Sequence, residues 1–302
     1  MTGKKMLILG ASGGIGLCMY EHLGPERSIA SYFANRIEGG IYFDALHQDI
    51  AEVVSPDEIW HCMIFLADSD PDSCESNPVL SHKLNVESTC RIIDRLETWQ
   101  MPFTFASSEC VFDGSSGPNI EGDVAKPIML YGQQKLDVEH YLGETYPDSA
   151  WTIMRLGKVF GASTDSAKLF SGWIGAIENG DVIRIATDQM FSPIHVSDVV
   201  KACLLAAEKK AWGLYHLCGL RPYSRYELLQ MVVKFVRRYN DSEARIEKCS
   251  IDDFDLRTPR PKNCSMLPTK LIDATGLYIT PIDEVCRRIV DEYYAVTDMA
   301  RA

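Results

Sequence analysis

Short apolar runs alternate with longer stretches of helical periodicity through the first half of the chain. The apolar runs predict strands, and the longer stretches, such as the one in which Leu84, Ile92 and Leu96 recur, predict helices. This alternation is typical of β–α–β units, so we expect a doubly wound parallel sheet. The predicted strands span residues 6–9, 28–33, 41–43, 58–66, 103–107 and 151–155, and the predicted helices span 15–23, 78–99 and 128–146.

After Gly157 the alternation weakens, and glycine, proline and polar clusters divide the sequence into shorter pieces. We expect an α/β fold in two parts. A Rossmann-type domain covers residues 1–157, and a smaller C-terminal α/β lobe covers residues 158–302, mainly binds substrate and returns some segments to the first domain. A crevice at the carboxyl ends of the strands is the expected ligand site. In the second part, helices are predicted over 167–178, 196–209, 226–240 and 282–294.

The composition narrows the class of protein. With 302 residues, 46% of them hydrophobic, the chain can bury a sizeable core. Its net charge of −12 disfavours nonspecific nucleic-acid binding, which needs a basic surface. No apolar run of about 18 residues indicates a membrane span and no secretory signal is visible, so we expect a cytoplasmic protein. The ten cysteines are scattered singly without a Cys-x-x-Cys pair, so we expect reduced thiols and no metal site.

A glycine-rich turn follows the first predicted strand. Gly10, Gly13 and Gly16 form a Gly-x-x-Gly-x-x-Gly pattern between that strand and a helix. In a dinucleotide site such glycines supply a tight turn, close backbone approach to a pyrophosphate and close packing of the helix, whose N-terminus attracts the phosphates. The alternative is a merely structural turn. We expect the cofactor to contact Gly10, Ser12, Gly13, Gly14, Ile15 and Gly16.

The end of the second predicted strand should show how the adenosine ribose is recognised. An Asp or Glu there would bind a free 2′-hydroxyl, but this chain has Asn35 and Arg36. The Arg36 guanidinium can fork onto a 2′-phosphate, so NADPH is favoured; NADH stays open because a solvated loop arginine is the alternative. Asp44 could accept a hydrogen bond from the adenine amino group or cap a turn. Further cofactor contacts are expected at Ala45, Leu66 and Ala67.

Tyr131 and Lys135 form a Tyr-x-x-x-Lys pair on a predicted helix, where the spacing places both side chains on one face. A phenol with a pKa of about 10 exchanges protons poorly at neutral pH, but a neighbouring ammonium and an oxidised nicotinamide draw that pKa toward the working range. Ser108 ends a predicted strand upstream and could hold a substrate carbonyl oxygen beside Tyr131; a plain strand-end hydroxyl is the alternative. The three residues predict carbonyl reduction, with Ser107, Tyr131 and Lys135 also near the cofactor.

Longer stretches resemble the extended short-chain dehydrogenases, and among them the dTDP-4-dehydrorhamnose reductase group. Ser107-Ser108-Glu109-Cys110-Val111-Phe112-Asp113-Gly114 is similar to the group's Ser-Thr-Asp-Tyr-Val-Phe-Asp-Gly. Residues 131–136 are similar to its Tyr-Gly-Lys-Thr-Lys-Leu, and the segment from Arg260 resembles its Arg-Pro-x-x-Ser-x-Leu. With residues 72–78 and 84–86, the resemblance covers nearly the whole chain.

The resemblance implies NADPH-dependent reduction of a nucleotide-linked 4-keto-6-deoxysugar. Cys110 stands where the group has an aromatic residue and Lys158 where members often carry tryptophan, so the sugar pocket differs. Related 4,6-dehydratases use two acids after the hydroxyl residue, and Cys110 in the second position disfavours that reaction. As partners we expect the nucleotide sugar and, in a homodimer, a second copy of the chain. The substrate should contact Ser108, Glu109, Cys110, Lys158 and Arg260.

Two other functions stay open. A nucleotide-sugar epimerase that oxidises and re-reduces its substrate on a retained NAD would use the same Ser108, Tyr131 and Lys135. A noncatalytic NADP-binding regulatory subunit is the other, because a relative of the reductase group is the noncatalytic partner of methionine adenosyltransferase. The intact catalytic residues weigh against this second alternative.

A polar segment near residue 195 has a simpler interpretation than catalysis. His195 and Asp198 could form an acid–base pair, but the start of a helix capped by Ser197 or Asp198 accounts for both. We therefore expect no catalytic role for them.

Basic residues near the C-terminus leave two interpretations open. Arg257, Arg260 and Lys262 either meet a substrate diphosphate or form a solvated loop in an otherwise acidic chain. We expect Arg155, at the end of a predicted strand, to be structural.

Overall fold

The computed structural model describes residues 3–161 and 165–301. Residues 1–2, 162–164 and 302 fall inside the two predicted domain ranges and lie outside the described residues.

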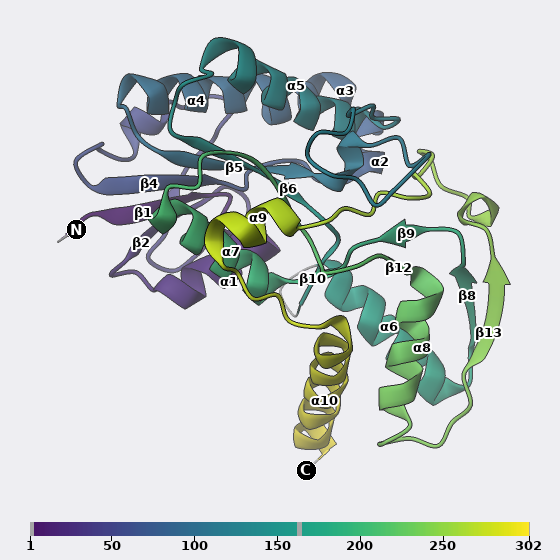
Figure 1. The fold of residues 1–302 in the computed structure, drawn as a ribbon. Coiled ribbons are helices and arrows are strands. Elements are labelled where there is room, and N and C mark those ends of the chain that lie inside the picture. The colour runs from purple at the N-terminus through teal and green to yellow at the C-terminus, as the bar shows by residue number, and fades with distance from the viewer. Residues whose placement is uncertain (1–2, 162–164, 302) are drawn as a thin grey trace.

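A seven-stranded parallel sheet forms the centre of the molecule (Figure 1). Its strands follow the order β11-β6-β5-β4-β1-β2-β3, and every neighbouring pair is parallel. The predicted Rossmann-type α/β fold is therefore confirmed. The strands are β1 (Lys5–Leu9), β2 (Ser28–Tyr32), β3 (Ile41–Tyr42), β4 (Ile59–Ile64), β5 (Phe103–Ser108), β6 (Trp151–Leu156) and β11 (Gly213–Leu217).

The six predicted strands did not include β11, which pairs with β6 at the edge of the sheet. Its sequence places the buried polar residue His216 inside a short apolar run, which weakens the strand pattern. Because β11 follows the long helix α7 (Val196–Lys209), chain from the second half of the sequence completes the sheet.

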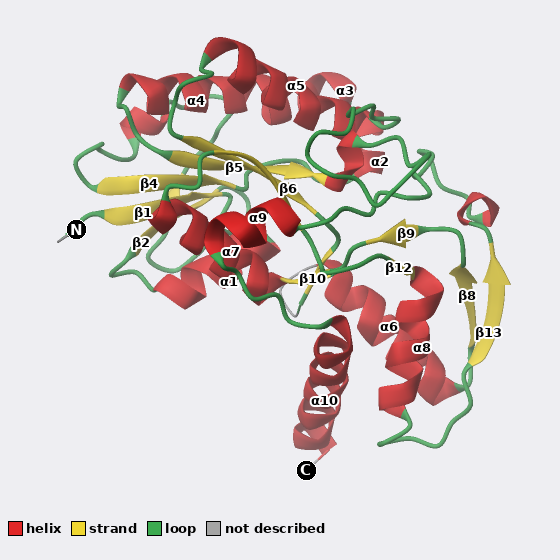
Figure 2. Cartoon of the chain, in the orientation of Figure 1, coloured by secondary structure: helices red, strands yellow, loops and turns green. Residues whose placement is uncertain are grey.

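Helices cover both faces of the sheet (Figure 2). Along β1, Met6 and Ile8 pack in the cluster that contains α1 (Gly14–Leu23), α7 and α9 (Thr269–Thr275). Leu7 and Leu9 instead pack with α4 (Thr89–Thr98) and α5 (Leu130–Thr145) on the opposite face. This alternation follows from the two-residue period of a strand, and it buries an apolar layer on each side of the sheet.

The helix predicted over 78–99 is present over residues 78–98, but its middle segment is π-helical. It consists of α3 (Pro78–His82), the π-helical segment η2 (Lys83–Ser88) and α4. In the widened turn, the Asn85 amide donates to the Asp68 carbonyl and to Gln134 Oε1 at 2.9 and 2.7 Å. A short preceding helix, α2 (Pro71–Ser76), was not predicted.

A second group of elements packs around its own core at the end of the sheet (Figure 1). The main elements of this group are α6 (Asp165–Asn179), β8 (Val182–Ala186), α8 (Arg225–Val236), β13 (Arg245–Cys249), η4 (Ile251–Asp253) and α10 (Ile282–Arg301). Helix α8 ends at Val236, before the predicted residue 240, and α10 runs past the predicted residue 294. Two-residue strands connect them: β7 (Val159–Phe160), β9 (Met190–Phe191), β10 (Ile194–His195) and β12 (Tyr223–Ser224).

Cysteines, metal ligands and membrane spans were also part of the sequence predictions. All ten cysteines carry free thiols. Across residues 3–161 and 165–301, no group of three His, Cys, Asp or Glu side chains is placed to hold a metal ion. In the same part of the chain, every helix is too short or too polar to cross a bilayer.

Candidate active site

A cavity of about 1100 Å³ opens at the carboxyl ends of the parallel strands. Residues of β5 line it from the sheet, and residues of α6, β8 and α8 line it from the C-terminal elements. This is the edge at which open α/β sheets bind ligands. The predicted site residues that line the cavity are Gly10, Ser12, Gly13, Gly14, Ile15, Gly16, Asn35, Asp44, Ala45, Leu66, Ala67, Ser107, Ser108, Glu109, Cys110, Tyr131, Lys135, Lys158 and Arg260.

The glycine-rich turn is shaped by close backbone contacts. Gly10 has φ +81°, and a Cβ there would lie 2.7 Å from the Leu66 backbone nitrogen. A Cβ on Gly16 would lie 2.5 Å from the Gly10 carbonyl oxygen, so α1 packs tightly against the turn. Gly13 is the N-cap of α1 and supplies no side-chain cap, so the first N–H groups of the helix stay open toward a ligand. The turn therefore fits a pyrophosphate.

The adenosine end of the cavity contains only part of the predicted set. Asn35 lines the cavity, whereas Arg36 is exposed and is not part of its lining. Asp44 caps its own turn: its carboxylate accepts from the Leu46 N–H at 3.0 Å and lies 2.8 Å from His47 Nδ1. These hydrogen bonds, together with the His47 charge, lower the pKa of Asp44 despite its partial burial.

The structure brings Ser108, Tyr131 and Lys135 together where β5 meets α5. Ser108 hydrogen-bonds to the Tyr131 phenol, and its Oγ also accepts from the Cys110 N–H at 3.2 Å. Lys135 Nζ donates to the Ala106 carbonyl at 2.8 Å and lies 5.8 Å from the centre of the Tyr131 ring. A hydroxyl, a phenol and an ammonium therefore converge at one end of the cavity.

Burial controls the protonation of this group. It raises the pKa of Tyr131 well above the ordinary value for a phenol, although the hydrogen bond from Ser108 opposes the rise. That the Lys135 ammonium and an oxidised nicotinamide together draw this pKa toward neutrality stays a prediction. Burial also lowers the pKa of Lys135 to about 8, while the negative charge of Glu139 raises it. At neutral pH the phenol is thus a proton donor beside a charged lysine.

The residues assigned to the substrate surround the same end. Burial raises the pKa of Glu109 to about 8, although the Lys158 and Arg225 charges and the Lys158 N–H oppose this. Burial likewise raises the pKa of the Cys110 thiol to about 11. At neutral pH, Glu109 and Cys110 are therefore both protonated. Arg260 forms an ion pair with Asp72 at 2.9 Å.

Two charged residues that the sequence reasoning missed belong to this region. Arg225, the first residue of α8, lines the cavity and donates from Nε to Gln189 Oε1 at 2.5 Å. Glu139 lies beneath the cavity, eight residues after Tyr131 on the same helix. Helical periodicity could have identified Glu139, because residues at i, i+4 and i+8 share a face. Arg225 had no local signal.

The structure also changes two secondary interpretations. Helix α7 is capped by His195 itself, whose Nδ1 accepts from the Ser197 N–H at 3.1 Å, so the predicted caps Ser197 and Asp198 are wrong. Asp198 is buried and accepts from the Thr280 N–H at 2.9 Å.

Of the basic cluster, Arg260 alone among its three members lines the cavity. Lys262 pairs with Asp188 at 3.1 Å and with Asp252 at 2.7 Å, and Arg257 donates to Ser76 Oγ. The predicted cluster therefore separates into one cavity residue and two that tie neighbouring segments together.

Comparison with known proteins agrees with this fold. The model of the RmlD substrate binding domain family matches residues 4–295. A probable low-salt glycan biosynthesis reductase, Agl14, of Haloferax volcanii is 28% identical over 198 residues, which are 64% of this chain and 64% of that protein, just under two thirds of its length. Methionine adenosyltransferase 2 subunit beta of Xenopus laevis is 28% identical over 292 residues, 90% of this chain and 82% of that protein.

Among solved structures, the dTDP-4-dehydrorhamnose reductase of Bacillus anthracis in complex with NADP has the same fold. The TM-score is 0.76 at 18% identity, over 96% of this chain and 100% of that chain. At this identity the similarity shows the fold alone.

Proposed function

The chain belongs to the RmlD substrate binding domain family, and from this premise we propose that it reduces a carbonyl group of a nucleotide-linked sugar with NADPH. One observation carries the proposal: Ser108, Tyr131 and Lys135 converge in the cavity that the glycine-rich turn also lines. A carbonyl oxygen held at Ser108 would then lie beside the protonated Tyr131 phenol.

The identity of the cofactor is inferred from the glycine-rich end of the cavity. The uncapped N-terminus of α1 and the close backbone of Gly10 and Gly16 fit a pyrophosphate. NADPH is favoured because Asn35 lines the cavity where an acidic partner of a free 2′-hydroxyl would stand, with Arg36 next to it. The bound NADP of the Bacillus anthracis reductase supports a nicotinamide dinucleotide as the cofactor. When bound, NADPH would supply the hydride.

The chain's own residues would handle the oxygen and the proton. Ser108 donates a hydrogen bond to the carbonyl oxygen and polarises it. Tyr131, held in its protonated form by burial, donates its proton to that oxygen as negative charge develops. Lys135 remains charged below a pH of about 8, binds the cofactor ribose and stabilises the phenolate that is left.

The finer substrate assignment is a nucleotide-linked 4-keto-6-deoxysugar. It rests on the resemblance of residues 107–114 and 131–136 to the dTDP-4-dehydrorhamnose reductases, one of which shares the fold. The sugar would lie against Ser108, Glu109 and Cys110, with Lys158 and Arg260 at the same end of the cavity.

The experiment is NADPH consumption by the pure protein against a panel of nucleotide-linked 4-keto-6-deoxysugars. Wild type should turn over at least one of them, and Tyr131→Phe should lower kcat by about 10²–10⁴ with little change in NADPH affinity, because only the proton donor is lost. A Tyr131→Phe protein with unchanged kcat would contradict the proposal.

A noncatalytic NADP-binding subunit is the second candidate, because relatives over 90% of the chain are named methionine adenosyltransferase 2 subunit beta. NADPH binding without turnover, together with a stable complex with a methionine adenosyltransferase, would favour it.

The nucleotide-sugar epimerase with retained NAD is separated by another observation. Protein purified with tightly bound NAD, released only on denaturation, would favour the epimerase over both other functions.

A further inference from the structure

Helix α5 carries three ionisable side chains on one face. Tyr131, Lys135 and Glu139 are spaced by four residues, so they follow one another along the side of the helix that faces β5 and β6. The proposed reaction uses the first two. Glu139 is buried and does not line the cavity, so it has no contact with substrate in this arrangement.

Glu139 ties the helix to two strands. Its Oε1 accepts from Ser107 Oγ at 2.5 Å and from Arg155 Nε at 3.1 Å, and its Oε2 accepts from Arg155 Nη2 at 2.6 Å. Ser107 and Arg155 are directly paired across β5 and β6. One carboxylate thus holds β5, β6 and α5 together directly behind Ser108.

The charges in this cluster do not balance as a simple ion pair. Lys135, Glu139 and Arg155 are each at most 6% exposed, so two cationic side chains are buried near a single carboxylate. Arg155 contacts that carboxylate directly, and Lys135 lies one turn before it on the same face of α5. Apolar residues of similar volume often stabilise a fold as well as a buried ion pair does, so packing alone does not account for the arrangement. The cation that gains most from a second partner is Lys135, whose ammonium otherwise meets a carbonyl oxygen and two ring faces.

We propose that Glu139 is a positioning residue for the reaction: it keeps Lys135 charged and, through Ser107, holds the end of β5 that carries Ser108, while Arg155 fixes its carboxylate. The inference rests on the proposed function, because it assigns the cluster to the same site. Arg155, which the sequence indicated to be structural, thereby supports the site through Glu139.

The other titratable groups around Lys135 do not replace Glu139. Cys74 on α2 is the other group whose charge favours the charged lysine, but burial raises the pKa of this thiol to about 11, so it is neutral in the working range. The remaining titratable groups on the elements packed against α5 are Asp72 and Glu75 on α2, Lys83 and Glu87 in η2, Cys90, Arg91, Asp94, Arg95 and Glu97 on α4, and Glu109 and Cys110 in the short 3₁₀ helix η3 (Glu109–Val111).

The test compares Glu139→Gln with wild type across pH. Glutamine keeps the shape and an acceptor for Ser107 but removes the charge. The pKa of Lys135 should then fall below about 8, and the alkaline loss of kcat should begin at lower pH. A shift of one pH unit would lower kcat about tenfold on the alkaline side.

A second variant separates a role in catalysis from a role in stability alone. It is needed because Glu139→Gln leaves the Arg155 charge buried without its partner. The double variant Glu139→Gln with Arg155→Met removes both charges. If the pair only stabilises the fold, the double variant should recover the wild-type pH profile. We expect its alkaline limb to remain shifted.

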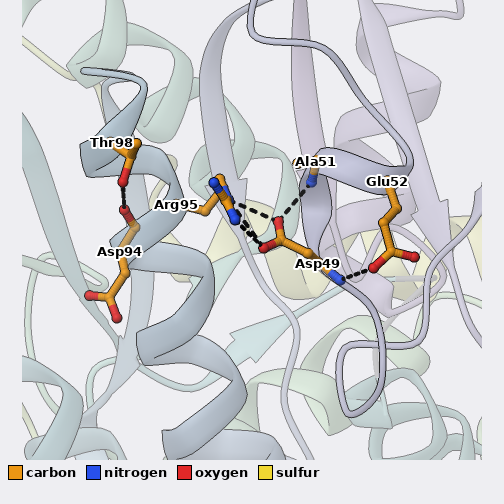
Figure 3. Close-up of polar contacts among 6 residues, drawn as sticks. All are labelled: Asp49, Ala51, Glu52, Asp94, Arg95 and Thr98. Carbon is orange, nitrogen blue, oxygen red and sulfur yellow. Dashed lines mark hydrogen bonds and ion pairs between the residues drawn. The ribbon is translucent and has the colours of Figure 1, made fainter.

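A matched control removes a different ion pair of the same sheet domain. Arg95 Nη2 lies 2.6 Å from Asp49 Oδ2 (Figure 3). Both side chains are more than a third exposed, and neither residue lines the cavity. Asp49→Asn should reproduce the wild-type pH profile. A folded Glu139→Gln or double variant with the wild-type alkaline limb would overturn the inference.

NADPH binding over the same pH range, followed by its fluorescence, reads the state of Lys135 without turnover. If NADPH affinity falls at lower pH in Glu139→Gln than in wild type while no sugar is reduced, the result supports the inference and contradicts the proposed function. If the sugar is reduced but the pH dependences of kcat and of NADPH affinity are the same in Glu139→Gln and wild type, the proposed function is supported and the inference is contradicted. Absence of NADPH binding at every pH overturns both.

Discussion

The two ends of the cavity differ in the groups that form them: closely packed backbone at one end and buried charged side chains at the other. At the glycine-rich end, backbone atoms approach one another so closely that a Cβ on Gly10 or Gly16 would lie within 2.8 Å of other backbone atoms. The ion pair of Asp49 with Arg95 lies at the surface, with both side chains more than a third exposed. At the catalytic end, Lys135, Glu139 and Arg155 are all buried.

This difference matches what each end has to do. Phosphates can be bound by N–H groups and a helix dipole, which require a backbone shape and no ionisable side chain. Proton transfer needs groups whose pKa values are shifted by burial and by neighbouring charges. The catalytic end therefore contains the buried charges, and the cofactor end contains the steric constraints.

Among the variants that compare the two ends, the largest effect is expected from one that removes a catalytic group and leaves the cofactor end unchanged. Ser108→Ala removes the hydroxyl that would polarise the substrate carbonyl, so kcat should fall by about 10²–10³. NADPH affinity, measured by fluorescence, should stay near that of wild type, because the backbone at the other end is unchanged. Loss of NADPH binding with unchanged kcat at saturation would reverse the assignment of the two ends.

The next largest effect is expected from a substitution that violates the steric constraint at the cofactor end. Gly16→Ala places a Cβ 2.5 Å from the Gly10 carbonyl oxygen and 2.7 Å from Ala11 Cα, both backbone atoms that cannot easily move. Overpacking of this kind costs about 1–3 kcal/mol of unfolding free energy and should weaken NADPH binding as well. Denaturant unfolding and a binding titration measure the two effects.

The matched control for this prediction is Gly143→Ala on α5, where a Cβ has open space. Alanine at this exposed helical position should stabilise the protein by about 0.5–1 kcal/mol. If Gly16→Ala and Gly143→Ala have the same unfolding free energy, the close backbone approach in the turn does not constrain the residue at position 16.

The smallest expected effect tests the surface ion pair. The hydrogen bond from Arg95, aided by the Ala51 N–H, lowers the pKa of Asp49 despite some burial (Figure 3). A carboxyl with a lowered folded pKa stabilises the protein above its unfolded pKa, and this contribution is lost as pH falls through the folded value. Asp49→Asn keeps a helix cap but lacks the charge, so its melting temperature should lie slightly below that of wild type at neutral pH.

In acid the two melting curves should converge, since wild type loses the charge that the variant never had. A difference that persists unchanged below the lowered pKa would mean that the ion pair does not contribute to stability. The small size expected here reflects solvent exposure, in contrast to the buried cluster at the catalytic end.

The sequence predicted the features that depend on a few contiguous residues. The turn from Gly10 to Gly16 and the spacing of Tyr131 and Lys135 were recognisable because strand and helix periods relate neighbouring residues directly. The doubly wound sheet was predicted for the same reason. Strand β11 was not predicted, because His216 interrupts its apolar pattern. The π-helical turn was not predicted either, because the Asn85 amide bonds Gln134, which is far away in the sequence.

The sequence by itself therefore determined the type of fold and the chemical groups available for catalysis. Only the tertiary structure decided their electrostatic states and their supporting contacts. Burial, a property of the whole fold, raises the pKa of Tyr131 and lowers that of Lys135. The pairing of Glu139 with Arg155 and the arrival of Arg225 in the cavity depend on elements far apart in the chain, whose contacts no local period specifies.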